Sequence, residues 1–119
     1  MNNRCHILFL CFLLFSSNNL FADSKTPTIE EYINDTSGAY DSYIYGLESG
    51  LEWASEYYFR KHQIELFCKP NGIKLPSSRL REIIDSEIQK KPGFFEKYKN
   101  EPLVGLALRN GYISEFPCS

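Results

Sequence analysis

Histidine and cysteine, the residues that most often carry catalysis and bind metals, are scarce in this sequence. Of its 119 residues, two are histidines and four are cysteines. No cysteine pair has CxxC spacing and no histidine pair has HxxxH spacing, whereas structural zinc sites usually take four ligands at short spacings. A catalytic nucleophile also needs a neighbouring base. The scarcity argues against an enzyme and against a bound metal or other cofactor.

The sequence also lacks an apolar run long enough to cross a membrane. Its longest run, residues 7–15 (ILFLCFLLF), has nine residues, whereas a transmembrane helix needs about 20. Arg4 precedes this run and the small residue Ala22 follows it, which is the layout of a secretory signal peptide. We therefore expect residues 1–22 to be a signal peptide and residues 23–119 to form one exported domain, with no membrane contact after cleavage.

Positive charge is in short supply as well. The chain has 13 Lys and Arg residues against 15 Asp and Glu residues. Without Arg4, which would leave with the signal peptide, 12 basic residues face 15 acidic ones, a net charge of −3. Proteins that bind nucleic acid usually carry a basic surface. The composition therefore argues against nucleic acid as a partner.

The cysteines that remain after signal cleavage form one pair. Cys5 and Cys11 lie in the signal peptide, which leaves Cys68 and Cys118. Cys68 has three interpretations: a nucleophile, a metal ligand or half of a disulfide. His62 would be the one base or third ligand available, too little for either kind of site. Because disulfides persist in exported proteins, we expect a Cys68–Cys118 disulfide that ties the C-terminus to the middle of the chain.

Apolar residues recur at helical spacings along the exported part, and no segment alternates like a strand. Thr28 followed by Glu31 has the form of a capping box, which predicts a short first helix. We expect an all-α domain, a small bundle of four to five helices with one disulfide. The predicted helices span residues 29–33, 39–62, 77–90 and 102–110, with residues 94–98 as a single turn or an aromatic loop.

The longest predicted helix carries two glycines, Gly46 and Gly50, one turn apart. Each costs about 1 kcal/mol of helix propensity relative to alanine. We therefore expect another backbone to approach this face closely, the alternative being an exposed face that tolerates both. Trp53 and Tyr57 lie off the predicted apolar face of the same helix. They are expected to form either a dimer seam or the rim of the core.

Several short motifs occur along the chain in an order that matches a known protein family. They are Gly46 and Gly50 in the long helix, Phe67-Cys68-x-Pro70-x-Gly72, Lys91-Pro92 after a helix, and the terminal Phe116-Pro117-Cys118. In this order the sequence resembles the Rap/Tai family, small periplasmic immunity proteins of bacterial type VI secretion. Many members carry a further cysteine in the first helix, which this chain lacks. The resemblance implies an all-α fold, the Cys68–Cys118 disulfide, often a homodimer, and a role in binding and blocking a peptidoglycan amidase toxin.

An inhibitor of this kind needs a cluster of surface anchors. Phe94, Phe95 and Tyr98 lie in the least regular predicted segment. They are candidates for a protruding anchor, unless two of them close the open end of the bundle, as most aromatic residues of a small domain lie in the core.

Acidic residues form a second candidate for partner binding. Glu48, Glu52 and Glu56 recur every four residues in the long helix, which predicts a negative ridge. Such a ridge is either a solvated face or a surface that attracts the basic cleft of a toxin.

Two classes of function are consistent with these features. The first is an immunity protein that occludes an amidase toxin by binding. The second is a periplasmic stress or chaperone-like helical protein of unknown ligand. In the second class, low pH would neutralise the carboxylates, loosen a dimer and make tyrosine-rich faces adhesive. A neighbouring gene for a small amidase with a Cys/His pair would favour the first.

Overall fold

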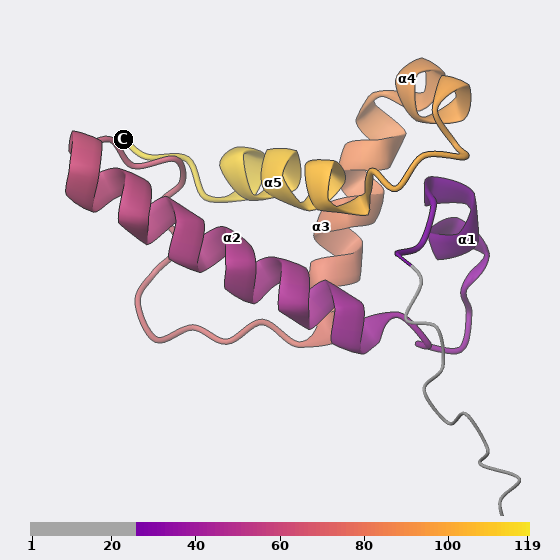
Figure 1. The fold of residues 1–119 in the computed structure, drawn as a ribbon, viewed down its shortest axis with the longest axis horizontal. Helices are drawn as coiled ribbons and strands as arrows, with labels where there is room; N and C mark the ends of the chain where they lie inside the picture. The colour runs from indigo at the N-terminus through magenta and orange to yellow at the C-terminus, as the bar shows by residue number, and fades with distance from the viewer. Residues whose placement is uncertain (1–25) are drawn as a thin grey trace, which may run out of the picture.

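The computed structural model describes residues 26–119, so the predicted signal peptide lies outside the described residues. Within this range the chain forms five α-helices and no strand (Figure 1), which confirms the predicted all-α fold. Residues 94–98, predicted as a turn or a loop, lie mostly in a short helix. The helices are α1 (Ile29–Asn34), α2 (Asp41–His62), α3 (Ser77–Lys90), α4 (Pro92–Lys97) and α5 (Val104–Glu115).

Helix α1 begins at the predicted capping box. The Glu31 backbone N–H donates to Thr28 Oγ1 at 3.1 Å, and the Thr28 backbone N–H donates to Glu31 Oε2 at 2.9 Å. These bonds satisfy donors that would otherwise lack partners at the start of a helix. The Ile29 backbone N–H then donates to the Glu101 carbonyl at 3.1 Å. This contact docks the short helix on the segment between α4 and α5.

The core lies between α3 and α5, and α2 runs alongside α5 (Figure 1). Helix α2 contributes Ile44 and Ser55 as its only buried residues. Ala54 and Tyr58, which belong to its predicted apolar face, are exposed. The C-terminal half of α2 is therefore mostly open to solvent. The buried apolar side chains are Ile29, Tyr32, Ile44, Leu80, Ile83, Ile84, Phe95, Val104, Ala107, Leu108 and Tyr112.

The close contact between α3 and α5 depends on Gly111. The sequence predicts a helix end at Asn110 and Gly111, but α5 continues to Glu115. A Cβ atom added at Gly111 would lie 2.5 Å from Ile83 Cγ2 and 3.0 Å from the Ile83 carbonyl oxygen. These distances are shorter than carbon atoms tolerate, so any side chain here would push the helices apart. The predicted helix end is wrong because Gly111 does not terminate α5; its missing side chain lets α3 approach α5 closely.

Gly46 and Gly50 have no such role within the described chain. Outside the backbone of their own helix, no heavy atom of residues 26–119 lies within 4 Å of a Cβ atom added at either position. Both residues are exposed, because the core forms on the opposite side of α2. The prediction that another backbone approaches them closely is wrong for this chain taken alone.

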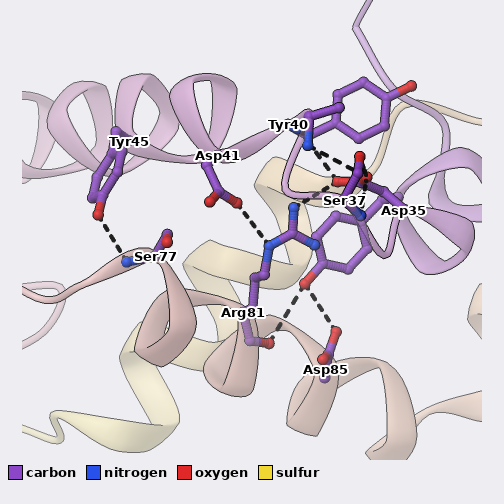
Figure 2. A network of polar contacts seen from close by, with 10 residues as sticks. Asp35, Ser37, Tyr40, Asp41, Tyr45, Ser77, Arg81 and Asp85 are labelled. Atoms are coloured by element: carbon purple, nitrogen blue, oxygen red, sulfur yellow. Dashed lines mark hydrogen bonds and ion pairs between the residues drawn. The ribbon is translucent and has the colours of Figure 1, made fainter.

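A polar network ties α1 and the start of α2 to α3, as Figure 2 shows. Arg81 of α3 donates from Nη2 to Asp35 Oδ2 at 2.7 Å and from Nε to Asp41 Oδ1 at 2.9 Å. The Tyr32 hydroxyl donates to Asp85 Oδ1 at 2.9 Å. Burial first, and then this bond to a carboxylate, raise the pKa of Tyr32 far above its usual value. Charge-assisted bonds of this kind fix the position of the short α1.

Asp35 makes the stability of this network depend on pH. Its carboxylate accepts from the Ser37 hydroxyl at 2.7 Å and pairs with Arg81, and both interactions hold the pKa of Asp35 below its usual value. A lowered pKa stabilises the fold above the unfolded-state value of about 3.9, and that stabilisation is lost as the pH falls further. We expect the urea midpoint to fall between about pH 4 and pH 2.

The variant Asp35→Asn tests this expectation. Its neutral amide cannot titrate, so the variant should be less stable than wild type at pH 7, and its urea midpoint should change less below pH 4. Equilibrium unfolding followed by circular dichroism measures both midpoints. Parallel pH profiles for the two proteins would contradict the assignment to Asp35.

Candidate protein-binding surface

The predicted disulfide is present and holds the tail of the chain in place. Cys68 and Cys118 are bonded, with their Cα atoms 5.0 Å apart. Beside the bridge, the Cys68 backbone N–H donates to the Phe116 carbonyl at 2.7 Å. Glu65 also lies close to the two sulfur atoms, but sulfurs in a disulfide offer no thiolate for a metal or for nucleophilic attack. The covalent interpretation of Cys68 is thus confirmed.

Lys69, the residue after Cys68, packs onto α2 and neutralises part of the predicted acidic ridge. Its Nζ atom lies 3.3 Å from Glu48 Oε1 and also pairs with Glu52. The side chains of Lys69 and Glu48 are 11% and 12% exposed. The Tyr112 hydroxyl donates to the same Glu48 carboxylate. Glu48 is therefore enclosed by the fold, and its predicted place in a free negative ridge is wrong.

The charges of Lys69, Glu48 and Glu52 stabilise one another. Burial opposes a charge on Lys69, but the hydrogen bonds and charges of Glu52 and Glu48 outweigh it and raise the pKa of Lys69. Burial, and then the bond to Glu48, raise the pKa of Tyr112 far above its usual value. Lys69 thus holds the 63–76 connection on α2 through ion pairs with Glu48 and Glu52, while the disulfide ties the same connection to the C-terminal tail.

The aromatic residues of α4 divide between core and surface. Phe95 is buried in the core, so it is not the surface anchor that the sequence predicts. Phe94 and Tyr98 are exposed, and their ring centroids lie 4.9 Å apart. The fold separates the three because residues 94 and 98 share one side of the helix and residue 95 faces inward. Phe94 and Tyr98 remain candidate contact residues.

The side of α2 that faces away from the core carries no charge over four turns. We call this side the outer α2 stripe, and it consists of the exposed residues Ser42, Gly46, Ser49, Gly50, Trp53 and Tyr57. Trp53 and Tyr57 are 67% and 63% exposed, so they are not the rim of the core. Outward faces of helices normally carry charged residues. An uncharged stripe with two exposed aromatic side chains is typical of a face that binds another protein.

A groove opens on a different side of α2, against the connection that leads to α3. We call it the α2–α3 groove; its volume is about 670 Å³. Among its lining residues are Glu52 and Glu56, two members of the predicted acidic series, together with Ser55, Phe59 and Ile73. Phe59 and Ile73 are exposed, and Glu56 pairs with Arg60 at 2.9 Å.

Sequence reasoning missed most of this groove. The spacing of Glu52, Ser55, Glu56 and Phe59 places them on one side of a helix, which is a usable signal. The course of the 63–76 connection beside that face depends on the ion pairs of Lys69 with Glu48 and Glu52, and no local pattern encodes it. The wall contributed by Ile73 could therefore not be predicted from spacing.

Comparisons of the chain with family models, with curated proteins and with solved structures find no match. The resemblance to the Rap/Tai family therefore stays a prediction. No helix within residues 26–119 is long and apolar enough to cross a bilayer.

Proposed function

We propose that this protein is a periplasmic immunity protein that binds a peptidoglycan amidase toxin of type VI secretion and occludes its active site. The observation that carries the proposal is the α2–α3 groove with the exposed side chains Phe59 and Ile73 on its walls. A groove with exposed apolar walls is a suitable receptor for a protruding side chain of another protein.

Rigidity of the groove supports the same proposal. The ion pairs of Lys69 fix the 63–76 connection on α2, and the disulfide at Cys68 ties the same connection to the C-terminal tail. A binding surface that is already ordered loses little conformational entropy when the partner docks. An inhibitor must hold its toxin tightly, and preordering of this kind favours a slow dissociation rate.

Co-expression with the product of an adjacent amidase gene tests the proposal. When the toxin is directed to the periplasm of a bacterial host, the full-length protein should prevent lysis, and the two proteins should co-purify. A version that lacks residues 1–22 should bind the toxin in vitro but give no protection in cells. Failure to bind the toxin would contradict the proposal.

A chaperone-like role, the alternative function, is supported by a different surface of the protein. A chaperone-like protein would prevent aggregation of unfolded clients at about pH 3, where carboxylates are neutral. The exposed Trp53 and Tyr57 give such a protein an apolar surface. Suppression of aggregation at that pH, without any binding to the toxin, would favour this alternative over the immunity role.

We also propose that the protein forms a homodimer through the outer α2 stripe. In an antiparallel pair of α2 helices, Trp53 would lie over Gly50 of the partner subunit, and Tyr57 over Gly46 of the partner subunit. Both pairings share one centre, between residues 51 and 52, so a single two-fold axis satisfies both. Each ring would fill the space that a missing side chain leaves, which accounts for two glycines on an exposed helical face.

The variant Gly50→Gln separates the dimer from the monomer fold. Because no other part of the described chain lies near Gly50, the substitution should raise helix stability by up to about 1 kcal/mol. It should weaken dimerisation at least tenfold, which is about 1.4 kcal/mol. Analytical ultracentrifugation measures the association. Ser86→Gln, at an exposed position of α3, is the matched control and should leave the dimer intact. A wild-type protein that stays monomeric at 100 µM would contradict the proposal.

A further inference from the structure

The α2–α3 groove contains a buried hydroxyl group without a hydrogen bond. Ser55 is 8% exposed and lines the groove, and its side chain makes no hydrogen bond to any residue in the described part of the chain. No fully enclosed side-chain oxygen or nitrogen among residues 26–119 lacks a partner. The Ser55 Oγ atom must therefore open onto the groove. An accessible hydroxyl with no partner among the described residues can accept a hydrogen bond from a ligand.

The groove also holds one carboxylate that no cation of the described chain neutralises. The lining residues include three carboxylates, those of Glu52, Glu56 and Glu65, and two ammonium groups, those of Lys69 and Lys74. Lys69 pairs with Glu48 and Glu52, and Glu56 pairs with Arg60, so Glu65 and Lys74 are the lining groups that form no ion pair within residues 26–119. An entering cation would therefore meet an unpaired carboxylate and a hydroxyl acceptor.

Aromatic rings complete the site. Phe59 is an exposed wall of the groove. Phe67, also in the lining, is held edge-on against Tyr112 with ring centroids 5.2 Å apart. An aromatic face attracts a cation placed over it. Among side chains, arginine matches this combination best, because its planar guanidinium stacks on rings while its five N–H groups reach carboxylates and hydroxyls.

We infer that the α2–α3 groove receives an arginine side chain of the protein that this chain binds. The guanidinium donates to Ser55 Oγ and to the Glu65 carboxylate, and its plane lies against Phe59. This inference deepens the proposed function and rests on it in so far as the arginine belongs to the toxin. The groove itself is a property of this chain and can be tested without the toxin.

Titration with a small probe tests the site. We expect N-acetyl-arginine amide to bind with a Kd on the order of 1 mM, as suits a ligand of its size. In ¹⁵N–¹H NMR spectra the amide signals of Ser55, Phe59 and Gly72 should shift, and added salt should weaken binding. N-acetyl-citrulline amide has the same shape without the charge and should not shift these signals. Equal binding of the two probes, or shifts confined to other residues, would overturn the inference.

Two variants test the contacts. Glu65→Gln and Ser55→Ala should each weaken binding of the arginine probe by about fivefold. Glu82→Gln, which alters an exposed carboxylate of α3 that pairs with Arg79, is the control and should leave the affinity unchanged. Unchanged affinity in Glu65→Gln would overturn the inference.

The two proposals can fail separately. If the toxin is bound and neutralised while the probe and the variants show no effect at the groove, the inference about arginine is wrong and the immunity role stands. If the probe binds as expected but no amidase is bound, the groove is a cation site and the proposed function is wrong.

Discussion

Replacing both Cys68 and Cys118 with serine is expected to lower the free energy of unfolding by about 4 kcal/mol. The disulfide joins residues 50 positions apart, and a cross-link of that span removes much conformational entropy from the unfolded chain. Domains of this size have a total stability of about 5–15 kcal/mol. At about 4–8 °C for each kcal/mol, the melting temperature should fall by roughly 15–30 °C.

Thermal unfolding of three samples measures this effect. The wild-type protein with its disulfide intact is compared with the double serine variant and with reduced, alkylated wild type. The last two should unfold at similar temperatures, because both keep the bond from the Cys68 backbone N–H to the Phe116 carbonyl and lose the covalent tie. A decrease below about 5 °C would mean that packing alone holds the tail, and it would contradict the prediction.

Local signals in the sequence were sufficient to predict most of the fold. The capping box at Thr28 and Glu31 specifies the start of α1, because the bonds involved span three residues. Helical spacing specifies α2 and α3, since both fold with one face toward the core. The disulfide follows from the two cysteines that remain once the predicted signal peptide is set aside. Each of these features depends on residues close together in the sequence or on the number of cysteines.

The features that sequence reasoning missed depend on contacts between distant residues. Glu48 belongs to a regular acidic series, but Lys69 and Tyr112 enclose it from positions 21 and 64 residues away. Helix α3 starts without a side-chain cap of its own, and the Ser77 backbone N–H donates instead to the Tyr45 hydroxyl at 2.8 Å (Figure 2). Spacing along one helix says nothing about which distant side chain meets it, so the site could be predicted only in part.

Replacing Gly111 with alanine is expected to destabilise the protein by about 1–2 kcal/mol. The added Cβ atom would lie 2.5 Å from Ile83 Cγ2 and 3.0 Å from the Ile83 carbonyl oxygen. The Ile83 side chain is buried and β-branched, so it has little freedom to rotate away, and the helical carbonyl oxygen cannot move alone; α3 and α5 must therefore separate. Overpacking of this kind costs about 1–3 kcal/mol, and alanine recovers up to about 1 kcal/mol through helix propensity.

Gly93→Ala is the matched control, because no heavy atom of the described chain lies within 4 Å of a Cβ atom at Gly93. Its stability should stay the same or rise by up to about 1 kcal/mol. Urea unfolding measures the change in the free energy of unfolding for each variant. The change should be negative for Gly111→Ala and zero or positive for Gly93→Ala.

A double-mutant cycle with Ile83→Ala identifies the contact that causes the loss. Removing the Ile83 side chain eliminates the 2.5 Å clash and leaves the one with the carbonyl oxygen. The cost of Gly111→Ala should therefore be at least about 1 kcal/mol smaller in the Ile83→Ala background, an interaction energy within the usual range for residues in contact. Strictly additive effects would show that the contact with the Ile83 side chain does not cause the loss.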